Sequence, residues 1–142
     1  MGFPLEISLR AETDLTELFW LANVSFAHVP GWSDRRVREL LSRDIVFVAR
    51  AGAQPAGYVA LQHDREPRLV VIEHLLVAPG HERRGVGRQL LAYAEGYAIA
   101  EGASSLRVVV EEDNWRARGF YRRSGFAPVE PELMELVLPR LR

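Results

Sequence analysis

The sequence predicts a mixed α/β fold in which helices cover both faces of one central sheet. Three observations lead to this prediction: strand-like runs alternate with helical patterns, the strongest run is apolar on both parities, and glycine or proline separates successive segments. The expected order of elements is β-α-α-β-β-β-α-β-α-β-β. A length of 142 residues suits one domain, so residues 1–142 are expected to form a single domain.

The first third of the chain is expected to form one strand and two helices. Residues 5–10 alternate weakly between apolar and polar side chains, as a strand does. Thr13 or Asp14 can cap the first helix, and Ser33 can cap the second. The apolar residues with helical spacing are Leu15, Leu18, Phe19, Ala22 and Phe26 in the first helix and Val37, Leu40 and Leu41 in the second.

Three strands are expected next. Residues 45–49 and 57–61 are apolar runs joined by a turn at residues 51–55. Residues 69–77 form the strongest strand, because both of its parities are apolar apart from Glu73 and His74. Such a strand is expected to be central and covered on both sides.

The last part of the chain is expected to alternate helices and strands. Gly102 and Gly125 follow two helical patterns and are typical helix terminators. The expected helices are residues 85–101 and 114–124, and the expected strands are residues 106–110, 126–129 and 133–138.

Composition excludes several kinds of function. The net charge is −1, which implies no general attraction to nucleic acid, and the absence of cysteine excludes disulfides and thiolate chemistry. The four histidines show no metal-ligand spacing, so no metal is expected. The N-terminus does not resemble a signal peptide, and no apolar run approaches the ~18 residues of a membrane span. We therefore expect a cytoplasmic protein without a membrane or nucleic-acid partner.

The segment of residues 82–88 is the densest signal for a binding site. It reads Glu-Arg-Arg-Gly-Val-Gly-Arg and lies between the strongest strand and a helix. A helix start offers unpaired N–H groups, glycine allows close backbone approach, and arginines there are unfavourable unless an anion binds. The pattern therefore favours a phosphate cradle, although a solvated turn with glycines for geometry remains an alternative. It fits neither a Walker loop nor a dinucleotide fingerprint.

Two motifs in this order and spacing resemble the GNAT superfamily of N-acetyltransferases. The first is the family's pyrophosphate loop, matched by Gly85 and Gly87 after the strand end of residues 75–79. The second is Asn114-x-x-Ala117-x-x-Phe120-Tyr121-x-x-x-Gly125-Phe126. The resemblance covers roughly residues 44–126 and departs at Glu82, where the family prefers arginine or glutamine. A carboxylate would repel a pyrophosphate, so Glu82 is not expected to be a ligand.

The resemblance implies a GNAT-like fold that uses acetyl-CoA as co-substrate. Its pantetheine would lie in a splay between the fourth and fifth strands, and its pyrophosphate would lie on the glycine loop. Asn114 and Tyr121 would also contact the donor. The implied donor-binding residues are Leu75, Leu76, Val77, Arg83, Arg84, Gly85, Val86, Gly87, Arg88, Asn114 and Tyr121.

Two residues are candidates for the chemistry. Glu73 lies on an otherwise apolar strand face, where burial would raise the pKa of a carboxyl toward that of a general base. The resemblance also implies a glutamate base there, and Tyr121 as the acid that protonates the leaving thiolate. The alternatives are a structural glutamate paired with an arginine and a core tyrosine. His74 is expected to be a core histidine, and Asn114 can also cap its helix.

These residues indicate acetyl transfer to a primary amine by direct attack, because no cysteine is present to form an acyl-enzyme. The acceptor could be a small-molecule amine or a protein amino group, and the resemblance leaves a homodimer open. Phe26, His28 and Trp32 could line the acceptor pocket or pack as an ordinary loop. Three alternatives remain: transfer of another acyl group, a non-catalytic CoA-binding sensor, and a protein-interaction domain that binds no CoA.

Overall fold

The computed structural model describes residues 4–26 and 33–140 and confirms the predicted α/β fold. Seven strands form one sheet in the order β1-β2-β3-β4-β5-β7-β6. It is mixed because β4 and β5 are parallel, whereas β1–β2, β5–β7 and β6–β7 are antiparallel. The elements are β1 (Leu5–Leu9), the 3₁₀ helix η1 (Glu12–Asp14), α1 (Leu15–Phe26), α2 (Asp34–Arg43), β2 (Ile45–Ala51), β3 (Gln54–Asp64), β4 (Leu69–Val77), α3 (Val86–Ala100), β5 (Ser105–Val109), α4 (Trp115–Arg123), β6 (Ala127–Glu130) and β7 (Leu133–Val137).

The chain divides into two compact units. The first comprises residues 1–60 and 74–93, and the second comprises residues 61–73 and 94–142. The strands β3 and β4 and the helix α3 each continue from one unit into the other. No helix in the described residues is long and apolar enough to span a membrane.

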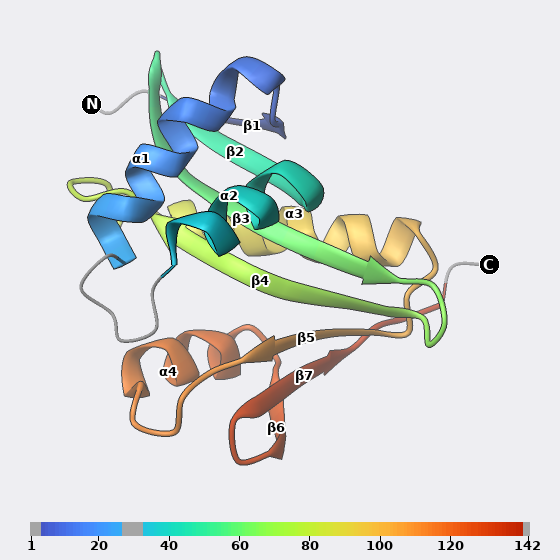
Figure 1. Cartoon of the computed structure of the whole chain (residues 1–142). Helices are drawn as coiled ribbons and strands as arrows, with labels where there is room; N and C mark the ends of the chain where they lie inside the picture. The colour runs from blue at the N-terminus through green and yellow to red at the C-terminus, as the bar shows by residue number, and fades with distance from the viewer. Residues whose placement is uncertain (1–3, 27–32, 141–142) are drawn as a thin grey trace. The chain divides into compact units, whose positions relative to one another are not determined.

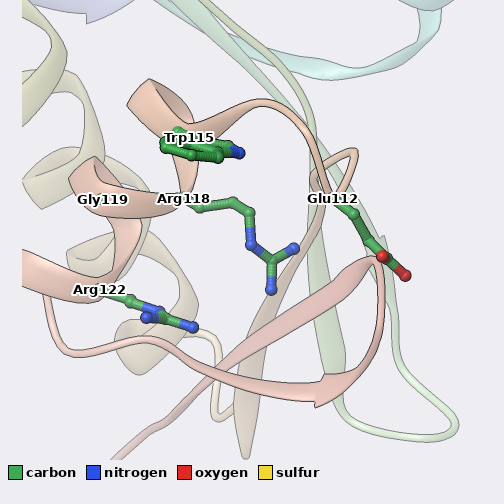
Figure 2. A pocket seen from close by; sticks show the side chains of 5 residues that line it. All are labelled: Glu112, Trp115, Arg118, Gly119 and Arg122. Atoms are coloured by element: carbon green, nitrogen blue, oxygen red, sulfur yellow. The ribbon is translucent and has the colours of Figure 1, made fainter.

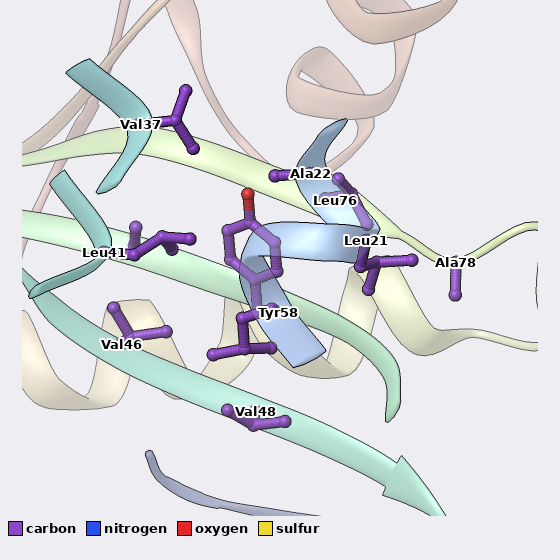
Figure 3. Close-up of a cluster of buried hydrophobic side chains, with 11 residues drawn as sticks. Leu21, Ala22, Val37, Leu41, Val46, Val48, Tyr58, Leu76 and Ala78 are labelled. Carbon is purple, nitrogen blue, oxygen red and sulfur yellow. The ribbon is translucent and has the colours of Figure 1, made fainter. Parts of the chain in front are cut away.

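In the first unit, α1 and α2 lie on one side of β2 and β3 (Figure 1). Their apolar faces pack with side chains of β2, β3 and β4 into one core cluster (Figure 3). The buried members are Leu18, Leu21, Ala22, Val37, Leu41, Val46, Val48, Tyr58, Ala60, Leu76 and Ala78. The predicted cap of the second helix is confirmed, because Ser33 Oγ accepts a hydrogen bond from the N–H of Arg36 at 3.4 Å.

On the opposite side of β3, the start of α3 approaches the strand closely at Gly57. A Cβ atom at this position would lie 2.4 Å from the carbonyl oxygen of Leu76 and 3.2 Å from side-chain atoms of Val86 and Leu90. Only glycine leaves room for this packing. Helices therefore cover both faces of the sheet here, as predicted.

A buried tyrosine and a histidine form a polar pair in the first unit. Tyr58 is fully buried, and its hydroxyl lies 3.0 Å from Nδ1 of His74 in hydrogen-bond geometry. Burial lowers the pKa of His74 and raises that of Tyr58, so both groups are neutral at pH 7. His74 is thus satisfied by a hydrogen bond, as expected, and lies half-buried in the sheet.

In the second unit, the first half of β4 pairs in parallel with β5, from Leu69 opposite Ser105 to Ile72 opposite Val108. β7 and then β6 continue the sheet in antiparallel pairing. α4 follows β5 and begins at a side-chain cap, since Asn114 Oδ1 accepts a hydrogen bond from the N–H of Ala117 at 3.2 Å. The predicted cap at Asn114 is therefore confirmed.

Two expectations need correction. Neither Thr13 nor Asp14 is the N-cap. The 3₁₀ turn begins after Ala11, and the Asp14 carboxylate accepts a hydrogen bond from the N–H of Ala11 at 2.7 Å. In addition, β4 is not covered equally on both sides. One face carries the buried residues Val70, Ile72 and Leu76, whereas the face with Glu73 is only half-buried.

Replacing Gly57 by alanine is expected to destabilise the protein by about 1–3 kcal/mol, because the new methyl group overlaps backbone as well as side chains. Gly96→Ala in α3 is the matched control. Its Cβ would meet nothing within 4 Å, so it should stabilise the protein by up to about 1 kcal/mol. Urea unfolding of both variants measures the difference, and equal stabilities would contradict the packing at Gly57.

The His74 environment predicts a loss of stability in mild acid. The pKa of His74 is lowered from 6.5 in the folded protein, so the unfolded chain binds the extra proton and stability falls as pH drops below that value. The stability that comes from keeping His74 neutral is fully present above the unfolded pKa. Below it, the free energy of unfolding falls by at most about 1.4 kcal/mol per pH unit through this group. Urea unfolding between about pH 7 and pH 5 should show a shallower slope in His74→Gln than in the wild type. Identical slopes would contradict this assignment.

Candidate active site

The loop before α3 has an unusual backbone. Gly80, Arg83 and Gly85 adopt left-handed φ angles of 89°, 63° and 78°. A positive φ is uncommon for a residue other than glycine, so the turn at Arg83 is held by its surroundings. Turns of this kind direct successive N–H groups to one side and form a concavity that binds anions.

The first turn of α3 adds unpaired donors to this loop. The first helical hydrogen bond runs from the N–H of Gln89 to the carbonyl of Gly85 at 3.0 Å. The amides of Val86, Gly87 and Arg88 therefore precede the helical ladder and have no intrahelical acceptor. The Val86 side chain is 1% exposed and fixes this turn to the core. The cradle predicted at residues 83–88 thus has the backbone geometry of an anion site.

Three arginines lie next to or among these amides in the sequence. Arg83, Arg84 and Arg88 are exposed, and none forms an ion pair with another described residue. Cations at the positive end of a helix repel its dipole, and a bound anion removes that cost. The local charges and donors therefore fit a pyrophosphate group.

Glu82 has a local role in this loop. Its Oε2 accepts a hydrogen bond from the N–H of Gly80 at 2.8 Å. Hydrogen bonds from the backbone N–H groups of Glu82 itself and of Gly80 lower the pKa of its carboxyl. The carboxylate is thus bound back onto its own turn, which explains how an acid is tolerated at a position where it would repel a phosphate.

At the end of β4, successive side chains lie on opposite faces of the strand and differ in burial. The Leu76 side chain is buried in the core cluster, whereas Leu75 and Val77 are half-buried on the face that carries Glu73. Leu76 can therefore contact a ligand only through its backbone.

Glu73 lies on the half-buried face of β4 in the second unit. Its carboxylate forms no ion pair or side-chain hydrogen bond with any residue that the structure describes. The alternative of a structural glutamate paired with an arginine therefore has no partner among these residues. A carboxylate in this state can accept a proton from a ligand.

Tyr121 lies on α4 in the second unit, and its side chain is 5% exposed. Its ring makes edge contacts with Phe120 and Phe126 at centroid distances of 5.1 and 5.2 Å. Burial raises the pKa of Tyr121, so the phenol stays protonated at neutral pH. A protonated phenol can act as a proton donor.

The predicted site residues fall into two groups. Glu73, Asn114 and Tyr121 belong to the second unit, and residues 75–77 and 83–88 belong to the first. Of the proposed acceptor-pocket residues, Phe26 ends α1, whereas His28 and Trp32 lie outside the described residues. The described residues contain no cluster of three or more side chains able to hold a metal.

The pocket on α4 was not predicted from the sequence. Glu112, Trp115, Arg118, Gly119 and Arg122 line a pocket of about 330 Å³ (Figure 2). The signal for it was the tryptophan and two arginines spaced three and seven positions apart, which places them on one face of a helix.

Known proteins resemble this chain in sequence and in fold. Streptothricin acetyltransferase from Streptomyces lavendulae is 38% identical over 86 residues, which is 61% of this chain but only 45% of that protein. The ribosomal-protein-S18-alanine N-acetyltransferase from Escherichia coli has the same fold, with a TM-score of 0.81 at 21% identity over 98% of this chain and 97% of that one. The PaiA N-acetyltransferase from Thermoplasma acidophilum, solved in complex with coenzyme A, superposes with a TM-score of 0.77 at 19% identity over 95% of this chain and 99% of that one.

The profile of the Acetyltransferase (GNAT) family matches residues 13–126, which include the glycine loop, Glu73, Asn114 and Tyr121. The chain therefore belongs to the GNAT family of acetyltransferases.

Proposed function

We propose that this protein transfers an acetyl group from acetyl-CoA to a primary amine. The observation that carries the proposal is the loop of residues 83–88, where unpaired helix-start amides, left-handed turns and three unpaired arginines favour a pyrophosphate. Family membership supports the same donor. Acetyl-CoA supplies an activated thioester, and the protein supplies binding, orientation and proton transfer.

The donor would be held mainly by backbone groups. The amides of Val86, Gly87 and Arg88 would donate to the pyrophosphate, with Gly85 allowing close approach and Arg83 and Arg84 neutralising its charge. The pantetheine amides would pair with the backbone at Leu75, Leu76 and Val77. Asn114 would use its side-chain NH₂ group, because Oδ1 already caps α4.

Glu73 and Tyr121 would move the protons of the reaction. An amine must lose its proton before it attacks, and the unpaired, half-buried carboxylate of Glu73 would accept that proton directly or through water. The departing thiolate needs a proton, and the neutral phenol of Tyr121 would supply it.

The acceptor amine is tested best by a panel that includes small polyamines, amino acids, aminated antibiotics and peptide N-termini. The name of the Streptomyces relative makes streptothricin the first candidate. Release of free thiol from acetyl-, propionyl- and succinyl-CoA identifies both the donor and the acceptor. Tight binding of CoA with no release of thiol for any pair would instead identify a CoA sensor.

The first prediction concerns donor binding. Gly85→Asp is expected to weaken acetyl-CoA binding at least roughly tenfold, because a carboxylate would face the pyrophosphate at the helix start. Gly85→Asn is the isosteric neutral control and should lose less affinity for acetyl-CoA. Gly102→Asp controls for backbone strain, since Gly102 has a φ of 77° against 78° for Gly85. Calorimetry that gives the wild-type affinity for folded Gly85→Asp would rule out the cradle.

A second prediction concerns Tyr121. The Tyr121→Phe variant should fold and bind acetyl-CoA normally, because the buried ring stays in place and its hydroxyl has no hydrogen-bond partner among the described residues. Its kcat should fall roughly 10²–10⁴-fold if the hydroxyl is the acid. Steady-state kinetics with a saturating acceptor measure this, and an unchanged kcat would assign the proton to another group.

The third prediction concerns Glu73. Glu73→Gln keeps the shape of the side chain but removes its basicity, so donor binding should survive while kcat/KM at neutral pH falls roughly 10²–10⁴-fold. In the wild type the base appears as an acidic limb of the pH profile, and in the variant the rate should become nearly linear in hydroxide. A variant with the wild-type rate and profile would show that Glu73 is structural and that another group is the base.

A further inference from the structure

The pocket on α4 is separate in chemistry from the proposed donor cradle. Trp115, Arg118, Gly119 and Arg122 project from one face of the helix, and Glu112 precedes it (Figure 2). Tyr121 lies on another face and is buried. The volume of about 330 Å³ is at the small end of ligand pockets, which suits a ligand of one ring.

Two guanidinium groups in this pocket are available to an anion. Arg118 Nη1 donates to the carbonyl oxygens of Val110 at 3.3 Å and Pro131 at 2.9 Å. These bonds orient the group and leave its other N–H donors unused among the described residues. Arg122 has neither a hydrogen bond nor an ion pair through its side chain within the described part of the chain. One preoriented and one exposed guanidinium suit a planar carboxylate.

An aromatic surface lies beside these cations. The Trp115 side chain is 81% exposed, and in Figure 2 its ring lies above the Arg118 side chain. Gly119 lines the pocket between the two arginines and adds no side chain to it. A flat apolar group could therefore lie against the indole while its acid meets the guanidinium groups.

The charge of the lining limits the ligand to one negative charge. Glu112 pairs with no described residue, and its carboxylate points away from Arg118 in Figure 2. The two arginines and the one glutamate of the lining give a net charge of +1, which suits a monoanion better than a phosphate or polyanion. We propose that this pocket binds a monocarboxylate attached to a flat aromatic group. The proposal does not depend on the acetyl-transfer activity.

The test is a titration of the whole protein with 3-phenylpropionate. Binding is monitored through the NMR chemical shifts of the Gly119 amide and the Trp115 indole N–H. A dissociation constant on the order of a millimolar is expected for a ligand of this size. Arg122→Gln should weaken binding roughly tenfold, and Trp115→Ala should do the same. Both side chains are exposed and unpaired, so the variants should fold. Arg116→Gln, an exposed arginine of α4 outside the pocket, is the matched control and should bind as the wild type does.

Four results would overturn the proposal. One is the absence of shifts at Gly119 and Trp115 up to roughly ten times the expected dissociation constant. Another is equal binding of the neutral amide 3-phenylpropanamide, which would remove the role of the arginines. The third is equal or tighter binding of phenyl phosphate, which would identify a general anion site. Loss of binding in Arg116→Gln as strong as in Arg122→Gln would also contradict a defined pocket.

Discussion

The close approach of α3 to β3 at Gly57 fixes the position of the proposed donor loop. With no side chain at Gly57, Val86 and Leu90 reach the strand, and the first turn of α3 is anchored to the sheet. The hydrogen bond from the N–H of Ala78 to the carbonyl of Ala56, at 2.8 Å, ties the end of β4 to the same strand. The loop between these two anchors is short, so its amides are directed by packing rather than by ligand binding.

This rigid frame explains how the loop tolerates unfavourable local features. Left-handed φ at Arg83 and three arginines at a helix start each cost stability in isolation. The hydrogen bond from the Gly80 N–H holds the Glu82 carboxylate on its own turn. The arginine side chains and the amides at the start of α3 then remain available to an anion. The proposed chemistry then uses two groups in different environments: a half-buried carboxylate at Glu73 and a buried, neutral phenol at Tyr121.

Much of this fold could be predicted from the sequence, because many of its elements are determined by interactions between residues close in sequence. Ser33 and Asn114 were predicted as caps because their side chains bond only to nearby amides. The alternation of residues along β4 could not show which of its faces is covered, because that depends on helices distant in sequence. Glu73 was expected to be buried, but the face that carries it is only half-buried. The turn at Ala11 was missed because the Asp14 side chain bonds back to the N–H of Ala11. The α4 pocket was missed because Arg118 is oriented by the carbonyls of Val110 and Pro131, which lie outside the helix.

The central claim is that the amides at the start of α3 receive the pyrophosphate of the donor. NMR titration of the ¹⁵N-labelled protein with CoA tests it most directly, with pantetheine as the control ligand that lacks the pyrophosphate. The account predicts large shifts of the Val86, Gly87 and Arg88 amides with CoA and small ones with pantetheine. Shifts of the same size with both ligands, or none at these three amides with CoA, would contradict it.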